Sequence, residues 1–552
     1  MAMHIIKLLS LIMLFTISFS SFFNPALSKQ SSPSPSPPSN ITWWCSKTPH
    51  PEPCKYFMSH SRQRYTLKHR TQFRKMMVQL AMDRAINAQK HVLQYGPNCD
   101  NNNRKAAWSD CLKLYANTVL QLNRTLQCLG GSNLNRSCTD FDAQTWLSTA
   151  LTNIQTCQLG SQELNVSADK FITQIRSNNL SQLISNSLAV NGVLMKKDQN
   201  VTYTSYGTDR GEEEENGFPS WLSRHDRRLL QSSLLKANLV VAKDGSGHYK
   251  TVKGAINAAA KRRVSSGRFI IYVKRGVYRE NIEVASNNNN IMMVGDGIRN
   301  TIITSGNSVG GGFTTFSSAT AGIDGFHFLA RDITFSNTAG PLKGQAVALR
   351  SASDLSVFYR CAFQGYQDTL FVHSQRQFYR ECYIYGTIDF IFGNAAVVFQ
   401  NCIILVRRPL KGQANVITAQ GRNDPYQNTA ISIQNSRIVA APDLKPVVRA
   451  FKTYLGRPWQ QYSRTVVIKT YIDSLVSPLG WSPWLETNFA LDTLYYGEYK
   501  NYGPGSSTRR RVKWRGFHVI NSPTVASRFT VGSLIAGRSW LPATGVPFTS
   551  GL

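Results

Sequence analysis

The N-terminal part of the chain has the apolar spacing of amphipathic helices. In FRKMMVQLAMDRAINAQKHVLQ the apolar residues recur at intervals of three, four, six and seven, with Arg, Lys and Gln between them. These positions are Phe73, Met76, Met77, Leu80, Ile86 and Leu93. Similar stripes run through CLKLYANTVLQLNRTL and FDAQTWLSTALTNIQTC. Helices with one apolar face must pack together, so an all-α helical bundle is predicted over residues 43–201.

Beyond residue 235 the pattern changes to short segments rich in Val, Ile, Phe and Tyr. Four of them align with a period of about 20 residues. They are FHFLARDITFSN (326–337), SVFYRCAFQGYQDT (356–369), RQFYRECYIYGTID (376–389) and VVFQNCIILVRR (397–408). Strands repeating at this interval predict the coils of a parallel β-helix. An antiparallel sandwich also spaces its strands regularly, but these segments lack the hairpin turns it needs.

The repeat places equivalent residues on adjacent coils, about 4.8 Å apart. Asp368 and Asp389 are 21 residues apart, which predicts two carboxylates side by side. Cys361, Cys382 and Cys402 recur at intervals of 21 and 20. At that spacing Cys382 could bridge to either neighbour, but not to both.

Two stacked carboxylates can supply an acid together with a nucleophile or base, because like charges this close cannot both ionise cheaply. Gln345 lies one further period before Gln367, and the two amides could stabilise an oxyanion. Arg457 in LGRPW could hold an aspartate as the anion, and Trp459 offers a flat wall for a sugar ring. A lone aspartate would more often cap a turn. Two on adjacent coils, flanked by glutamines, favour catalysis.

Other chemistries lack their motifs. The chain has no Asp-Thr-Gly and no Cys/His set with zinc spacing, so neither an aspartic protease nor a zinc site is indicated. A glycosidase also uses two carboxylates, but paired glutamine amides suit an acyl oxyanion. Alternatives of another class are a catalytically dead binding protein and, through the helical bundle, an inhibitor of other enzymes.

The charge balance favours a polyanionic partner. The 552 residues carry 62 Lys and Arg against 31 Asp and Glu, a formal net charge of +31. The C-terminal RRRVKWRG resembles a nucleic-acid patch in composition, but in a secreted chain a solvated edge or polyanion contact is favoured. No nucleic acid partner is expected.

The N-terminus has the layout of a secretory signal. Residues 8–23 are almost continuously apolar and small residues precede Lys29, so a signal peptide is predicted over residues 1–28. An uncleaved anchor is the alternative, because the run approaches the ~18 residues that suggest a membrane span. With cleavage, no stable membrane association is expected. A Pro/Ser-rich linker follows over residues 29–42.

A second linker, residues 202–230, separates the two halves, and the enzyme is expected over residues 231–552. It contains four consecutive glutamates and the dibasic pair Arg227 and Arg228, which predicts a site for a processing protease. Glycosylation sequons stand at Asn40, Asn123, Asn135, Asn165, Asn179 and Asn200.

The cysteines of the helical part leave their pairing open. Cys45 and Cys54 are close enough in sequence to close a small loop. Cys111 and Cys157 each lie in a helical stripe and could staple two helices. The remaining cysteines are Cys99, Cys128 and Cys138.

Five blocks resemble, in order, the signature blocks of plant pectin methylesterases. They are GVYRE (276–280), QAVALR (345–350), GYQDTL (365–370), GTIDFIFG (386–393) and LGRPW (455–459). DCLKLYANTVLQL and TWLSTALTNIQTC resemble the inhibitor domain that precedes the enzyme in longer members. The resemblance implies a right-handed parallel β-helix that hydrolyses methyl esters in cell-wall homogalacturonan. It releases methanol without metal or cofactor.

The resemblance also assigns roles. Asp389 matches the nucleophile that forms an acyl-enzyme, and Asp368 the proton donor and later base. Gln367 matches the residue that stabilises the oxyanion. Substrate-binding positions fall on Thr315, Gln345, Arg457 and Trp459, and Arg457 also holds Asp389. Gly344 and Phe371 depart from the family pattern without touching a catalytic role.

The family pairs cysteines in three bridges, Cys45 with Cys54, Cys111 with Cys157, and Cys382 with Cys402. This would leave Cys361 as a buried thiol. The family is processed after RRLL, so the mature enzyme would begin near Gln231 in the extracellular cell wall. The helical pro-region is expected to inhibit or chaperone the enzyme until processing.

Overall fold

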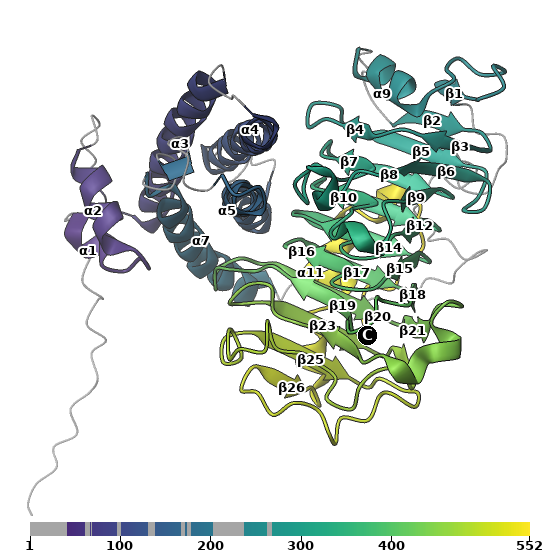
Figure 1. The fold of residues 1–552 in the computed structure, drawn as a ribbon. Helices are drawn as coiled ribbons and strands as arrows, with labels where there is room; N and C mark the ends of the chain where they lie inside the picture. Colours follow the sequence, from purple (N-terminus) through teal and green to yellow (C-terminus); the bar gives the residue numbers. More distant parts are fainter. Residues whose placement is uncertain are drawn as a thin grey trace, which may run out of the picture.

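The computed structural model describes residues 41–60, 67, 69–96, 101–130, 138–166, 172–173, 178–202, 237–261 and 268–552. The predicted signal segment and the linker with Arg227 and Arg228 lie outside the described residues, as do Asn40, Asn135 and Cys99. A domain of helices lies beside a long stack of strands (Figure 1). No described helix is long and apolar enough to span a bilayer.

The helical domain confirms the predicted bundle. Its helices are α1 (Ile41–Cys45), α2 (Pro51–Ser59), α3 (Arg70–Tyr95), α4 (Asn102–Gly130), α5 (Asp140–Glu163) and α7 (Leu180–Thr202). A capping box starts α5, since Asp142 N–H donates to Thr139 Oγ1 and Thr139 N–H donates to Asp142 Oδ2. α5 buries threonines and an asparagine as well as leucines, because both the bundle and the strand stack cover it.

The apolar stripe predicted in α3 is correct at one end and wrong at the other. Phe73, Met77 and Leu80 are buried, but Leu93 is 51% exposed. The buried face continues instead through Ala81, Ala85, Ala88 and Val92. Steps of three and four residues keep one face of a helix, whereas a step of six followed by seven turns away from it.

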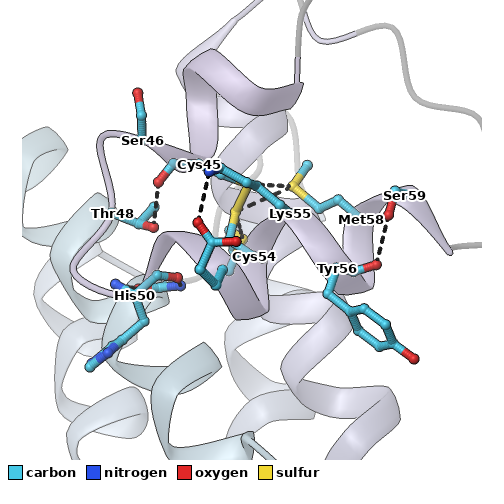
Figure 2. The surroundings of a disulfide bond; sticks show 12 residues. Cys45, Ser46, Thr48, His50, Cys54, Lys55, Tyr56, Met58 and Ser59 are labelled. Carbon is cyan, nitrogen blue, oxygen red and sulfur yellow. Dashed lines mark hydrogen bonds and ion pairs between the residues drawn. A yellow bond between two sulfur atoms is a disulfide. The ribbon is translucent and has the colours of Figure 1, made fainter.

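Three disulfides fix the helical domain. Cys45 joins Cys54, as expected, and the Met58 sulfur lies 3.4 Å from Cys45 Sγ (Figure 2). Cys111 joins Cys157, which staples α4 to α5. The structure also pairs Cys128 with Cys138, which the sequence left open.

The described sequons differ in exposure. Asn165 is exposed and has a left-handed backbone (φ 56°). Asn123 and Asn179 are half-buried, and the side chain of Asn200 lies outside the described residues. Glycosylation at these positions stays a prediction.

Residues 237–261 and 268–552 form the predicted parallel β-helix, in which the described strands make three parallel sheets. The eleven-stranded sheet holds β1 (Leu239–Val241), β2 (Phe269–Val273), β5 (Ile291–Gly295), β8 (Leu329–Arg331), β11 (Ser356–Tyr359), β14 (Arg376–Arg380), β17 (Ala396–Gln400), β20 (Ala430–Gln434), β23 (Arg464–Ile468), β25 (Tyr495–Tyr499) and β26 (Phe517–Val519). The seven-stranded sheet holds β4 (Ile282–Val284), β7 (Ala321–Ile323), β10 (Leu349–Ser351), β13 (Leu370–Val372), β16 (Ile391–Gly393), β19 (Asn415–Gln420) and β22 (Thr453–Gly456). The eight-stranded sheet holds β3 (Gly276–Arg279), β6 (Thr301–Ser305), β9 (Thr334–Asn337), β12 (Ala362–Gln364), β15 (Tyr383–Gly386), β18 (Ile403–Val406), β21 (Arg437–Ala440) and β24 (Tyr471–Ile472).

The aligned repeats become neighbouring coils. Phe358 pairs with Tyr379, and Tyr379 pairs with Phe399, in register. Their rings stack inside the core, with centroids 4.8 and 4.7 Å apart. The turn after each of these three strands contains a residue with φ between 51° and 56°. These residues are Arg360, Glu381 and Asn401. The sequence period therefore corresponds to the same left-handed bend in each of these three coils.

The predicted bridge between Cys382 and Cys402 is not present. Cys361, Cys382 and Cys402 are all buried free thiols. Cys382 Sγ donates to Phe358 O at 3.2 Å, and Cys402 Sγ donates to Tyr379 O at 3.5 Å. Cys382 and Cys402 therefore each contact a carbonyl of the preceding coil, and their neighbouring thiols are not joined by a disulfide.

Helices at the two ends of the β-helix domain pack against its strands. α9 (Val252–Lys261) packs its apolar face on the inner core at the N-terminal end. α10 (Pro523–Ser527) and α11 (Val531–Leu534) pack against the eleven-stranded sheet. The seven-stranded sheet faces the helical domain, and the eight-stranded sheet faces away from it (Figure 1).

Candidate active site

A pocket of about 220 Å³ lies between α5 and the seven-stranded sheet. All seven residues to which the sequence assigned catalytic or substrate-binding roles line it. These are Thr315, Gln345, Gln367, Asp368, Asp389, Arg457 and Trp459. They come from five separate segments of the β-helix, which the coils bring to one place.

The two aspartates occupy matching positions on adjacent coils. Asp368 stands two residues before Leu370 and Asp389 two residues before Ile391, and these two residues pair in register. Both aspartates have left-handed backbones, with φ of 60° and 50°. Aspartate tolerates this conformation better than most residues, and strained backbones of this kind cluster at functional sites.

A glycine allows the strand that follows Asp389 to end close to the neighbouring coil. Gly393 has φ of 126°, and a Cβ there would lie 2.1 Å from Val372 O. Only glycine can end β16 this close to the neighbouring coil. The final glycine of GTIDFIFG is therefore explained by backbone packing.

Arg457 holds Asp389 through both carboxylate oxygens. Arg457 Nε donates to Oδ1 at 2.9 Å, and Nη2 donates to Oδ2 at 2.6 Å. The guanidinium also lies over the Trp484 ring, 4.6 Å from the ring centroid. A planar, two-pronged donor fixed on one face by an aromatic ring holds the carboxylate in a single orientation.

The two carboxyls differ in electrostatic environment. Burial, the neighbouring Asp389 and Glu163 raise the pKa of Asp368 well above its usual value. Burial also raises the pKa of Asp389, but the hydrogen-bonded Arg457 opposes that rise. Asp368 is therefore the better proton holder and Asp389 the better anion.

Gln345 and Gln367 come from successive coils and line the same pocket. Ala346 N–H donates to Gln367 O at 3.2 Å, which joins the two segments. Their amide groups are therefore near the two carboxyls, where donors could meet a developing negative charge.

Three aromatic rings form the apolar wall. Phe371 and Phe392 stack with centroids 4.3 Å apart, and the Trp459 ring lies edge-on to both. The sequence prediction gave Phe371 no role and missed Phe392 and Trp484. Each Phe follows its aspartate by three residues, so the coil period already contained this signal.

The helical domain supplies the other wall of the pocket. Thr315 N–H and Oγ1 donate to the two carboxylate oxygens of Glu163, both at 2.8 Å. Thr156, Leu159 and Gly160 of α5 complete this wall. No local pattern in the sequence pointed to Glu163.

His373 is packed at the boundary between the two domains. Its Nε2 lies 2.9 Å from Thr156 Oγ1, and its Nδ1 lies 3.1 Å from Ser374 Oγ. Burial lowers the pKa of His373 to about 3, so the ring is neutral at ordinary pH. It is therefore a buried polar contact in this state of the chain.

Ion pairs join the domains outside the pocket. Lys113 of α4 pairs with Asp324 at 2.7 Å and also with Glu283. Asp142 of α5 pairs with Arg376 at 2.7 Å. Asp110 accepts a hydrogen bond from the Thr314 hydroxyl. These contacts position α4 and α5 across the mouth of the cleft.

Clusters of three or more His, Cys, Asp or Glu that could hold a metal ion are not found in the described part of the chain.

Two family models match the two halves. The model described as Pectinesterase matches residues 238–538, and the model described as Plant invertase/pectin methylesterase inhibitor matches residues 39–190. The first match covers the β-helix and the second the helical bundle.

Known proteins resemble the chain over most of its length. Probable pectinesterase/pectinesterase inhibitor 33 of Arabidopsis thaliana is 63% identical over 522 residues, which cover 93% of this chain and 86% of that protein. Pectinesterase 2 of Citrus sinensis is 53% identical over 552 residues, 100% of each chain. The solved structure of the pectin methylesterase from carrot is 59% identical with a TM-score of 0.57, and covers 58% of this chain and 100% of that chain. The chain thus belongs to the plant pectinesterases, carboxylic-ester hydrolases, and carries an inhibitor-type helical domain ahead of its parallel β-helix.

Proposed function

We propose that the chain hydrolyses the methyl esters of galacturonate residues in cell-wall pectin through an acyl-enzyme on Asp389. One observation carries the proposal. An aspartate held as the anion by Arg457 lies one coil from a buried aspartate whose pKa is well above its usual value. An anion and a proton donor in one pocket are the two groups that nucleophilic ester cleavage needs.

In the first half-reaction, Asp389 attacks the ester carbonyl and its carboxylate oxygen bonds to the carbonyl carbon. Gln367, assisted by Gln345, donates to the oxyanion. Asp368 gives its proton to the departing methanol. Trp459 and Thr315 contact the sugar.

In the second half-reaction, ionised Asp368 takes a proton from water, and the resulting hydroxide attacks the acyl-enzyme. The bond to Asp389 breaks, which releases the galacturonate group as its acid and restores both aspartates. The acid then gives its proton to solvent and becomes the carboxylate. Arg457 stabilises Asp389 each time it returns to the anion.

Methanol release from pectin tests these roles. Asp389→Ala should lower kcat by about 10⁴-fold or more, and Asp368→Ala by about 10²–10⁴-fold. Gln367→Ala should cost about 10²–10³-fold. Equal activity of wild type and Asp389→Ala would overturn the nucleophile assignment. Shortening of the polymer would indicate a glycosidase or lyase instead.

We also propose that the helical domain keeps the enzyme closed until processing at Arg227 and Arg228. The remaining pocket of about 220 Å³ is smaller than the ~300–1,000 Å³ of ordinary ligand sites. Glu163 lies where substrate would meet Thr315. The disulfides of this domain suit passage through an oxidising compartment to the cell wall.

An uncleavable chain tests this closure. Arg227→Ala with Arg228→Ala should release methanol at least tenfold more slowly than the cleaved chain, because substrate must displace α5 first. Undiminished activity of the intact chain would contradict an inhibitory role and leave the assigned roles of the aspartates unaffected.

A further inference from the structure

The GVYRE block takes no part in the pocket, and two of its residues have structural roles. Tyr278 is buried in the core. Glu280 accepts hydrogen bonds from Val252 N–H at 3.0 Å and Lys253 N–H at 2.9 Å, at the start of α9. Arg279, between them, is exposed and makes no ion pair within the described residues. Its side chain is therefore available for a ligand.

Arg279 borders an open hollow of about 630 Å³ on the outer face of the eight-stranded sheet. Thr304 and Ser336 line the same hollow. In this part of the chain the Thr304 hydroxyl is buried without a hydrogen-bond partner, and the residue is only 7% exposed. A buried hydroxyl normally has a partner, so the Thr304 hydroxyl lacks a hydrogen bond that a ligand entering the hollow could supply.

The hollow begins a row of side chains across five coils. Arg279 pairs in register with Thr304, and Thr304 with Ser336. Ser336 pairs with Gln364, and Gln364 with Tyr385. Four coil steps of about 4.8 Å give a row about 19 Å long. It presents a cation, two hydroxyls, an amide and a half-buried aromatic ring in a line.

We propose that this row is a second, non-catalytic binding site for de-esterified pectin. The Arg279 guanidinium would bind a galacturonate carboxylate, the hydroxyls of Thr304 and Ser336 and the amide of Gln364 would bind sugar hydroxyls, and Tyr385 would pack against a sugar face. The ligand carries a carboxylate and hydroxyls along one line, and the row presents a cation, hydroxyls and an amide that can bind them. The formal net charge of +31 favours such a polyanion over its neutral ester.

The described helices of the N-terminal domain leave this site uncovered. The eight-stranded sheet lies on the side of the β-helix that faces away from the helical domain (Figure 1). Glu280, the carboxylate at the edge of the hollow, is occupied by the two N–H groups of α9. The inference rests on pectin being the substrate, and not on the roles assigned to the two aspartates. It implies that the enzyme stays attached to pectin it has already de-esterified.

Calorimetric titration of the full-length chain with unesterified oligogalacturonate tests the inference, because α5 covers the catalytic cleft in this form. Arg279→Gln should weaken binding about tenfold, and Thr304→Val about threefold, through lost hydrogen bonds. The matched control is Arg437→Gln. Arg437 is an exposed arginine on β21 of the same sheet. Its removal should change affinity less than about twofold, because exposed charges at a distance are screened.

Several results would overturn the site. Wild-type affinity of the Arg279→Gln variant would overturn it. Equal losses of affinity in Arg279→Gln and Arg437→Gln would show that the positive charge of the whole surface, and not a specific site, attracts the ligand. If Arg279→Gln alters the thermal melt, Thr304→Val decides alone, and wild-type affinity in that variant ends the proposal. Fully methyl-esterified oligomer should bind at least tenfold more weakly, and equal binding would exclude carboxylate recognition. Failure of wild type to release methanol after cleavage would contradict the proposed function only.

Discussion

Glu163 of the helical domain accepts two hydrogen bonds from Thr315 of the β-helix, each at 2.8 Å. The helical domain thus places a carboxylate directly against a residue of the candidate active-site pocket. Burial raises the pKa of Glu163, and the hydrogen bonds from Thr315 oppose that rise. The contact is therefore specific in geometry. Leaving the buried Glu163 carboxylate without its donors would cost free energy.

Replacing Glu163 should partly open the intact enzyme. In a chain made uncleavable at Arg227 and Arg228, Glu163→Ala should raise methanol release at least tenfold, since even one hydrogen bond to a charged group contributes ~1.5–3 kcal/mol. Glu52→Ala is the control, because Glu52 is exposed in α2 and pairs with Lys55. If both variants match the parent chain, Glu163 does not hold the cleft closed.

The acid limb of the pH profile should depend on Arg457. Arg457 opposes the rise in the pKa of Asp389, so Arg457→Gln should let that pKa rise further. Activity would then require a higher pH, and the acid limb of kcat/KM should move upward, with a loss in kcat. Arg437→Gln should leave the limb in place. An unshifted limb in Arg457→Gln would indicate that Asp389 is not the group that titrates.

The raised pKa of Asp368 should lower the free energy of unfolding at neutral pH. Its folded pKa is raised, so its stabilising effect is full below the unfolded value of about 3.9 and is lost as pH rises toward the folded value. Asp368→Asn keeps the left-handed backbone but removes the ionisation. Its Tm should exceed that of wild type by about 2–4 °C at pH 7, and by little at pH 3.

Calorimetric scans at the two pH values check this expectation. Asp492→Asn, a change at an exposed carboxylate, should show no such pH-dependent gain. A Tm difference that is the same at both pH values would mean that packing, not ionisation, separates Asp368→Asn from wild type.

The three stacked cysteines should react as thiols only after unfolding. Burial raises the pKa of Cys361 to about 12 and that of Cys382 well above its ordinary value, so alkylation of the native chain should be slow. Alkylation in denaturant, followed by peptide mass spectrometry, should modify Cys382 and Cys402. The disulfide between Cys111 and Cys157 should survive as the internal control. Recovery of a linked Cys382 and Cys402 peptide would restore the bridge expected from the family.

The sequence predicted those site residues whose spacing equals the period of the β-helix. Asp368 and Asp389 are neighbours because their spacing equals one turn of the β-helix, and the same period contained Phe371 and Phe392. Arg457 was reached only through a motif, since the 68 residues from Asp389 span two coils of unequal length. Spacing could not decide among the cysteines, because the direction of each thiol is a rotamer choice inside the core.

The contacts between the domains were beyond prediction from the sequence for a different reason. Glu163 and Thr315 are 152 residues apart and belong to units with different periods. Their contact depends on how the surfaces of the two folded domains fit together, and no local sequence pattern encodes that fit. The same holds for His373, whose partner Thr156 comes from α5.

The position of the aspartate pair along the stack affects how the enzyme should fail. β13, which follows Asp368, has three strands on either side in its sheet. In a stack where each coil contacts only its neighbours, fraying starts at the two ends. Mild heat or dilute denaturant should therefore speed amide hydrogen exchange in the outermost coils first. The two carboxylates would keep their spacing until the central rungs open, but Arg457 follows β22 at the end of the same sheet. Activity should therefore fall with the outer coils, before the aspartate pair separates.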